Sequence, residues 1–520
     1  MAQSETAAAE GPGQFSAAAK PTAEDFDISQ RSEVAKLRKG AIGLGGVLFL
    51  TVTGSAPITA MMLNVPIMVG SGQGTGAPAA FLFAAIVLVV FSVGYVAMAR
   101  KKTTAGGFYS FISHGLGRDL GLGTGFASVA AYSVFEASLA GGFAYFLGGK
   151  LNAFGVNVSW PWLALGMVAL IGVLTYFDVS FSSKILAIGL ITEVLILIIF
   201  DIVLFARGHS PSASALNPVN AFKALPAQGK LAAGSVGLGL FFAFWSWVGF
   251  EMAPNYGEES RDPKRNVPRA LYISVIGLGV FYTLTSWASL SGYANIHDAA
   301  TQSLNSAYNY FLAPAGTYGG RWLSSVMSYL IITGSFACGM AFHNTTARYF
   351  YSLGREGMLP SALGRTHRRW QSPHIASITQ SVIAAIVIAL FAIFAGTANP
   401  STQAYGELYG LMAVMGVIII LSVQALVSFS IAIYYLRFHR DEVHWWKTLL
   451  APALSFVSQA FVVYLLFANF SSVAGTYPLA KWLGPIDAVV AVAGVGAAFW
   501  FKYRRPAKYE LAGRLINEGL

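Results

Sequence analysis

Charged residues are scarce in this chain of 520 residues: only 11% are Asp, Glu, Lys or Arg, whereas a soluble domain usually carries about 25%. Cysteine is almost absent, and its one copy, Cys338, stands within an apolar run. A single cysteine forms no disulfide within the chain, so a disulfide scaffold is excluded. Because 55% of the residues are hydrophobic, the composition argues against a secreted enzyme or a nucleic-acid binder and indicates an integral membrane protein.

The motifs of nucleotide and metal chemistry are also missing. The sequence has no phosphate-binding loop, no cluster of His and Cys with the spacing of metal ligands, and no nucleophile beside a plausible base. The glycines of GLGGVLF, which begins at Gly43, lie inside an apolar run rather than after a strand, so they do not form a dinucleotide-binding motif. We therefore expect no enzyme and no cofactor, and we expect the energy source to be an ion gradient or exchange.

Twelve apolar runs are each long enough to cross a bilayer core of about 30 Å. If the N-terminus is cytoplasmic, 27 of the 33 lysines and arginines fall on the cytoplasmic side and six on the other. The positive-inside rule therefore predicts twelve spans in the cytoplasmic membrane with both termini inside. The runs begin near Ala41, Pro78, Gly121, Trp160, Ile185, Gly234, Ala270, Leu323, Ile375, Leu408, Leu449 and Leu483.

The segments outside the spans are short. The first 27 residues are rich in Ala, Gly, Pro and Ser and have no basic residue before Lys20, which favours a disordered tail over a signal peptide. We expect a cytoplasmic tail with a short surface helix at 1–38, a first half of five spans at 39–206, an extracellular loop at 207–233, a second half at 234–440, spans eleven and twelve at 441–503, and a cytoplasmic tail at 504–520.

Two spans are interrupted near their middle. The first contains GSAP at residues 54–57, and its proline removes a backbone donor and clashes with the preceding turn. The sixth contains WSWVG at residues 245–249. Spans one and six are corresponding members of two five-span halves, and paired interruptions there indicate an inverted-repeat transporter with its site at the membrane midplane. The alternative is that the glycines permit close helix packing and the proline makes a kink.

The interruptions also predict a ligand. Each broken span is expected to present free carbonyls where one half-helix ends and free amides where the next begins. The amides of Ser55, Ala56 and Ile58 would hold an anion, and the carbonyls near Thr51, Val52, Phe244 and Trp245 would hold an ammonium. A small zwitterion such as an α-amino acid satisfies both. The residues expected at this site are Gly54, Ser55, Ala56, Pro57, Ile58, Phe244, Trp245, Ser246, Trp247 and Gly249.

Several longer stretches resemble one transporter family, and together they cover roughly residues 38–440. The chain resembles the amino acid, polyamine and organocation transporter superfamily. The resemblance implies an all-α membrane protein with the fold first associated with the bacterial leucine transporter: two inverted repeats of five helices, broken helices one and six, and two additional helices. The stretches are GSAP at 54–57, AGGFYSFISHGLG at 105–117, FWSWVGFE at 244–251, EESRDPKRNVPRA at 258–270, and 344–360, which ends in GREGMLP.

The resemblance also implies gates. Trp245 is similar to the tryptophan that closes over substrate in arginine and agmatine exchangers of the superfamily, and counting back from GREGMLP places Phe342 at a second aromatic gate. Glu251 stands at the family's GFE position and is expected to act at the inner gate. Ala56 and Pro57 are similar to the breaks of putrescine-importer-like relatives. The alternative for the aromatics is that they only pack the helix bundle.

Ionisable residues inside spans are costly to insert, so each is a functional hypothesis. A proton-coupled branch of the superfamily carries a lysine midway along span five, and the corresponding position, nine residues after Lys184, is Glu193. We expect Glu193 to couple transport to protons, or to sodium; the alternative is a structural carboxyl. Glu136 lies one helical turn from Tyr132 in span three, so the two share a face. If that face contacts the solute, Glu136 would select a second amino group.

These features predict a secondary transporter that moves a small amino-bearing solute by alternating access. An amino acid is the favoured solute, and proton-driven import is the default mechanism. A polyamine or other organic-cation transporter of the same fold is the first alternative, supported by Glu136 and the proline break. A non-transporting nutrient receptor and an ion channel are alternatives of another class. The expected partners are the solute and the lipid bilayer, without nucleic acid, and the protein is expected to be a monomer or a homodimer.

Overall fold

The computed structural model describes residues 37–102, 106–177, 179–475 and 477–511. Within these ranges the regular elements are helices, and eleven of them are long and apolar enough to cross a membrane. The chain is therefore an all-helical, multi-pass membrane protein, as predicted. Residues 1–36 of the expected N-terminal tail and 512–520 of the C-terminal tail lie outside the described residues.

The expected spans correspond closely to helices of the structure. The fourth expected span, α8 (Trp160–Thr175), has only 16 residues, so the count of twelve spans stays a prediction. The first span comprises α2 (Leu44–Ser55), α3 (Pro57–Thr59), a π-helical turn (Ala60–Asn64) and α4 (Val65–Ser71). The others are α5 (Ala77–Lys101), α7 (Arg118–Asn152), α9 (Val179–Arg207), α10 (Val236–Trp245) with the 3₁₀ helix η5 (Phe250–Glu259), α11 (Pro263–Leu290), α14 (Arg321–Arg355), α15 (His374–Phe394), the π-helix η8 (Pro400–Tyr409) with α16 (Gly410–Phe438), η10 (Trp445–Leu450) with α17 (Ala451–Ala468), and α19 (Leu483–Arg504).

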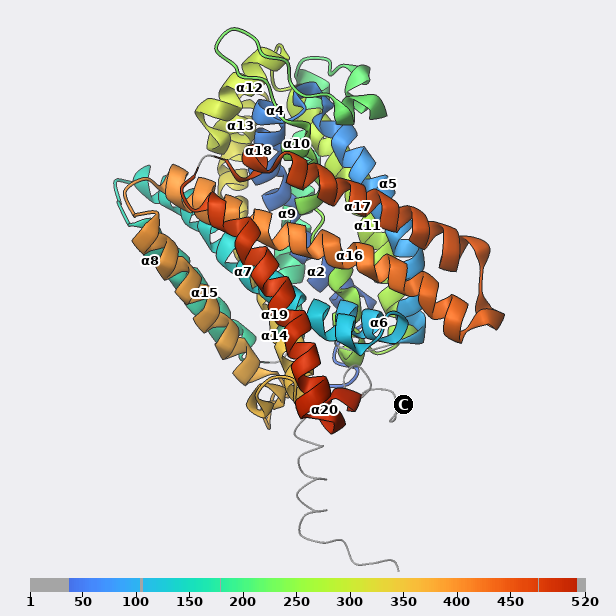
Figure 1. The fold of residues 1–520 in the computed structure, drawn as a ribbon. Coiled ribbons are helices and arrows are strands. Elements are labelled where there is room, and N and C mark those ends of the chain that lie inside the picture. The colour runs from blue at the N-terminus through green and yellow to red at the C-terminus, as the bar shows by residue number, and fades with distance from the viewer. Residues whose placement is uncertain (1–36, 103–105, 178, 476, 512–520) are drawn as a thin grey trace, which may run out of the picture.

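Shorter helices cap the two ends of the bundle. At one end lies α20 (Pro506–Leu511), close to the link that follows α14, and at the other lie α4, α12 (Ile296–Asn305) and α13 (Ala307–Pro314) (Figure 1). We call these the α20 end and the α12 end. By the positive-inside pattern the α20 end is expected to be cytoplasmic. Two further short helices are α6 (Gly107–Gly115) and α18 (Phe470–Ala474).

The helices divide into an inner and an outer group. In the most apolar stretch of α7, 78% of the residues are buried, and the same share applies to the first span, whereas α15 and α19 bury only 28% and 22%. The outer helices expose large apolar side chains, such as Ile393 and Val492 at 72% each. Such surfaces suit a bilayer, where lipid replaces water around them. The first span, α7, α10 and α14 therefore enclose the centre, while α8 and α15 pack side by side at its edge (Figure 1).

Candidate substrate site

The first span is interrupted at the predicted place. Helix α2 ends at Ser55, and Ala56 adopts a left-handed conformation with φ of 37°. Its amide donates to the carbonyls of Thr53 and Val52, at 3.1 and 3.0 Å, which closes the helix end. Pro57 then begins the next helical segment, where its missing N–H is no loss because the first amides of a helix have no partner within it.

The second interruption lies against the first. Helix α10 ends at Trp245, η5 begins at Phe250, and Gly249 between them has φ of 123°. A Cβ atom on Gly249 would lie 2.4 Å from the carbonyl carbon of Gly54. The Ser55 hydroxyl donates to the carbonyl of Trp247 at 3.1 Å. The two breaks therefore meet backbone to backbone at the centre of the bundle.

A small cavity opens beside this junction. Its polar wall carries hydroxyl and amide groups, and its apolar wall comes from several helices. None of the residues that the structure places around it is Asp, Glu, Lys, Arg or His. The lining residues are Gly54, Ser55, Ala56, Thr59, Ala60, Asn64, Leu139, Trp245, Ser246, Val248, Cys338, Phe342 and Tyr409.

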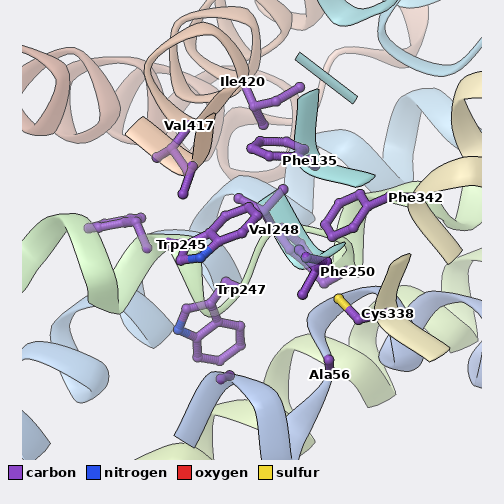
Figure 2. Packing of buried hydrophobic residues seen from close by; sticks show 14 of the residues in the cluster. Ala56, Phe135, Trp245, Trp247, Val248, Phe250, Cys338, Phe342, Val417 and Ile420 are labelled. Carbon is purple, nitrogen blue, oxygen red and sulfur yellow. The ribbon is translucent and has the colours of Figure 1, made fainter. Parts of the chain in front are cut away.

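Two aromatic rings stack at the cavity wall. The rings of Trp245 and Phe342 are nearly parallel, with centroids 6.0 Å apart and planes at 13°, and Phe135 packs against both, at 4.6 and 5.0 Å (Figure 2). The superfamily resemblance predicted gates at Trp245 and Phe342. The structure brings both rings to the cavity, where a movement of either one would change its size; their gating role stays a prediction.

A chain of polar side chains holds Trp245 to the first span. The indole Nε1–H donates to the Tyr409 hydroxyl at 2.8 Å, and that hydroxyl donates to Oδ1 of Asn64 at 2.5 Å. The Asn64 amide in turn donates to the Ser246 hydroxyl at 2.8 Å. Because these four residues come from both broken spans and from η8, a change in the packing of any one element is transmitted to the others.

Sequence interpretation missed several cavity residues. Asn64 and Tyr409 carry no local signal, since each is a polar residue at the side of an apolar helix. Cys338 lines the cavity and donates its thiol to the Gly54 carbonyl at 3.2 Å. The hydroxyl Oγ1 of Thr59 is buried with no hydrogen-bond partner, which makes it the clearest group for a solute to bind. Leu139, Ala60 and Val248 complete the missed set.

Of the amides expected to hold an anion, that of Ile58 has a carboxyl partner, and so has the Gly249 amide at the second break. The Ile58 amide donates to the Glu193 carboxylate, and the Gly249 amide donates to Oε2 of Glu251 at 2.9 Å. The other oxygen of Glu251 accepts from the Tyr132 hydroxyl at 2.8 Å. A carboxylate at the start of a helix is stabilised by the free amides there. The chain therefore supplies its own hydrogen-bond acceptors at both breaks.

The carbonyls expected to hold an ammonium also have partners. The carbonyl of Val52 accepts from Ala56, and those of Phe244 and Trp245 accept from residues of the link at 3.1 Å each. The Ser55 carbonyl accepts from the Tyr282 hydroxyl at 2.6 Å. A carbonyl oxygen has a second lone pair. The existing hydrogen bond therefore fixes the direction of each carbonyl and leaves it able to accept a second hydrogen bond from an ammonium group.

Several predicted site residues do not line the cavity. Glu136, expected to face the solute, accepts hydrogen bonds from Gln380 and contacts His343 instead. Trp247 packs its ring on Tyr282, with centroids 5.5 Å apart. Of the predicted residues, the structure gathers Gly54, Ser55, Ala56, Trp245, Ser246 and Phe342 around the cavity, and it places Pro57, Ile58, Tyr132, Glu136, Phe244, Trp247, Gly249, Glu251 and Glu193 outside its lining.

The site is closed more tightly toward the α20 end. There Arg348 forms a two-bond ion pair with Glu259, at 2.7 and 3.1 Å, and both side chains are at most 3% exposed. Arg355 pairs with Glu258 at 2.9 and 3.1 Å. Toward the α12 end lies a second, larger cavity, and Tyr409 lines both. The two ion pairs therefore lie on the α20 side of the site, and the second cavity lies on the α12 side.

Comparison with known families decides the class of the protein. Residues 44–489 match the family described as amino acid permease. The chain belongs to that family. With its eleven helices that could span a membrane, this permease is a multi-pass membrane protein.

Curated relatives of the permease are transporters of amino-bearing solutes or are known only as transporters. The branched-chain amino acid permease BcaP of Lactococcus lactis is 24% identical over 61% of this chain and 69% of its own length. The low-affinity putrescine importer PlaP of Escherichia coli K12 is 27% identical over 28% and 31%. The uncharacterized transporter lpg1691 of Legionella pneumophila is 27% identical over 34% and 38%. The chain thus aligns with only 31% and 38% of the lengths of the last two proteins.

Proposed function

We propose that this permease is a secondary transporter of a small zwitterionic amino acid with an apolar side chain. The observation that carries the proposal is the small cavity at the paired breaks, which has no acidic or basic side chain among its lining residues. A net charge in such a place lacks a counter-charge and is costly to bury. A zwitterion neutralises itself, and oriented dipoles suffice to bind it. The branched-chain permease among the relatives fits the same chemistry.

The proposed architecture is a twelve-span fold with two inverted repeats of five helices, and the proposed mechanism is alternating access. The paired breaks at Ala56 and Gly249 support it, because discontinuous helices in corresponding spans form midplane sites in such transporters. With the α20 end cytoplasmic, the structure is closed inward by Arg348 and Glu259. We place the protein in the cytoplasmic membrane with both termini inside.

A polyamine importer is the second candidate, because a putrescine importer is among the relatives. A diamine carries two positive charges and needs carboxylates to bind them. The carboxylates nearest to the breaks, Glu193 and Glu251, bind backbone amides, and Glu136 lies outside the cavity lining. This arrangement favours the amino acid.

Thermal unfolding of the purified protein tests the choice of solute. We expect a zwitterion with one amino group and an apolar side chain to stabilise the fold, by about 2.7 kcal/mol at a concentration of 100 times Kd. Replacing Trp245 by alanine removes a cavity wall and should weaken binding at least about tenfold. Trp322→Ala, at a site 54% exposed on α14, is the control and should bind normally.

The outcomes separate the alternatives. Stabilisation by diamines alone would move the assignment to a polyamine importer. Uptake of the stabilising solute into proteoliposomes then separates a transporter from a receptor, which binds without flux, and from a channel, whose flux does not saturate.

Glu193 is the proposed coupling residue, with a proton as the coupling ion and sodium as the alternative. Its carboxylate holds the Ile58 amide at the start of the outer half of span one. A solute carboxylate near the same break would be repelled by the ionised Glu193 through a medium of low dielectric constant. A proton on Glu193 removes this repulsion. Solute and proton therefore favour each other's binding, and this coupling is reciprocal.

Glu193→Gln should abolish concentrative uptake driven by a proton gradient, because glutamine neither binds nor releases the proton. Exchange of labelled for unlabelled solute should continue, since it needs no net proton movement. Asp201→Asn is the matched control: Asp201 lies eight residues further along α9 and accepts from Thr285 at 2.7 Å. We expect that variant to keep its gradient dependence. Unchanged proton and sodium dependence in Glu193→Gln would contradict the assignment.

A further inference from the structure

A second buried acid lies away from the substrate cavity, between α7 and α14. Oε2 of Glu136 is 2.9 Å from Nδ1 of His343, and both side chains are fully buried. The Gln380 amide of α15 donates to the same oxygen at 2.8 Å. The other carboxylate oxygen, Oε1, is buried and has no hydrogen-bond partner within the part of the chain that the structure describes. A contact of this length between an imidazole nitrogen and a carboxylate holds a proton between them.

The other face of the imidazole continues the hydrogen bonding. Nε2 of His343 is 2.8 Å from the Ser377 hydroxyl of α15, which is 2.9 Å from the Thr175 hydroxyl at the end of α8. Both hydroxyls are buried, and a hydroxyl both donates and accepts. An unbroken series of polar atoms therefore runs from Glu136 through His343 to the junction of α8 and α15.

From this junction two more histidines lead to the α20 end. His374 lies one helical turn before Ser377, so the two share a face of α15. The ring of Tyr176, which follows Thr175, contacts the rings of His374 and His367 at 5.8 and 5.3 Å. His367 and His374 are half-buried. Nδ1 of His374 is buried and has no hydrogen-bond partner among the described residues, so this nitrogen is available to accept or donate a proton near Ser377.

Other ionisable groups on the surrounding helices are engaged elsewhere or lie off this line. Tyr132 of α7 donates to Glu251, Arg348 of α14 binds Glu259, and Glu193 of α9 binds the Ile58 amide. Asp487 is buried on α19, which packs against the outer side of α7. From the described residues of the α8 and α15 side, the ionisable groups near the pair are Tyr176, which directly follows α8, and His374 of α15.

We propose that Glu136 and His343 form a buried proton-binding site, and that Ser377, Thr175, Tyr176, His374 and His367 connect it to solvent at the α20 end. A proton enters at the half-buried histidines and reaches Nε2 of His343 through the Ser377 hydroxyl. His343 then passes its Nδ1 proton to the Glu136 carboxylate, so the imidazole ends neutral and the acid is protonated. The reverse sequence releases the proton to the same side.

This site is separate from Glu193 and does not depend on the identity of the solute. It joins α7, α8, α14 and α15, whereas Glu193 acts at the break of the first span. Because the pair adjoins Phe342 in the chain, a proton there changes the charge beside a wall of the substrate cavity.

Infrared difference spectroscopy of the purified protein in lipid, after a jump in pH, tests proton binding without any transport. We expect a protonated-carboxyl band that disappears in Glu136→Gln and remains in Glu193→Gln. If Glu136→Gln does not fold, Glu136→Asp should shift the band instead. A difference spectrum in which no band responds to either Glu136 variant would overturn the site, whether or not the protein transports an amino acid.

The rate at which the band appears tests the path. Ser377→Ala and His374→Gln each interrupt the series of polar groups. Each should lower the rate at which the carboxyl band appears by about tenfold or more. His439→Gln is the control, because His439 is a half-exposed histidine that binds Tyr434, away from α8 and α15. Equal rates in the wild type, Ser377→Ala and His374→Gln would refute the path and leave any proton binding at Glu136 to another route.

Discussion

Gly249→Ala is expected to destabilise the protein so strongly that most of the yield of folded protein is lost. The new Cβ would lie 2.4 Å from the Gly54 carbonyl carbon and 2.7 Å from the Ser55 nitrogen, and these are backbone atoms that cannot rotate away. The φ of 123° adds strain for any residue with a side chain. Backbone strain costs about 1–3 kcal/mol and overpacking about the same, so we expect a loss of roughly 2–6 kcal/mol, a large part of the stability of most proteins.

The measurement is the yield of monodisperse protein in detergent and its unfolding temperature. Gly277→Ala is a matched control, since the residue is inside α11 and nothing lies within 4 Å of the Cβ that alanine would add there. That alanine should be neutral or stabilising by up to about 1 kcal/mol. Gly249→Ala with the yield and unfolding temperature of Gly277→Ala would show that the two breaks do not meet as closely as the structure places them.

Arg348→Met is expected to open the α20 end of the permease. The variant removes the two hydrogen bonds that Arg348 gives to the buried Glu259, and breaking a buried ion pair by removing one partner costs about 3–5 kcal/mol. This cost destabilises only the closed conformation. In a conformation that is open at the α20 end, water reaches Glu259 and solvates its charge. A change of that size is enough to move a conformational equilibrium from one side to the other.

The only cysteine of the chain reports the opening. Cys338 lines the cavity, so a membrane-impermeant thiol reagent applied at the α20 end should label it about tenfold faster or more in Arg348→Met than in the wild type. The double variant Arg348→Met/Glu259→Met removes both charges and should recover most of the closed state, since replacing a whole buried pair by apolar residues is often nearly neutral. Labelling that stays slow in the single variant would contradict a gate at this pair.

The cavity residues show why sequence alone identified only part of the site. Asn64, Leu139, Cys338 and Tyr409 lie on four different elements. Helices inside a membrane protein are apolar on most sides, so the periodicity of hydrophobic residues does not tell which side faces the centre. The rotation of each helix follows from its packing against neighbours far away in the chain. No local pattern could have selected these residues.

Glu136 illustrates the same limit for a charged residue. Its position one turn from Tyr132 correctly predicted a shared helix face, yet the two side chains bind different helices: Tyr132 donates to Glu251 and Glu136 contacts His343. These contacts reach from α7 to η5 and to α14, and Gln380 of α15 binds Glu136 as well. Adjacency on one helix therefore does not establish that two residues serve one ligand.

The sequence by itself determined the membrane class, the family resemblance and the places where two spans break. These are consequences of composition and of covalent structure: Pro57 lacks an amide hydrogen, and Gly249 tolerates a positive φ that other residues resist. Only the tertiary structure decided which groups meet at the breaks. Carboxylates from Glu193 and Glu251 take the amide ends, because a buried helix terminus must find partners, and which side chain reaches it depends on how the helices pack.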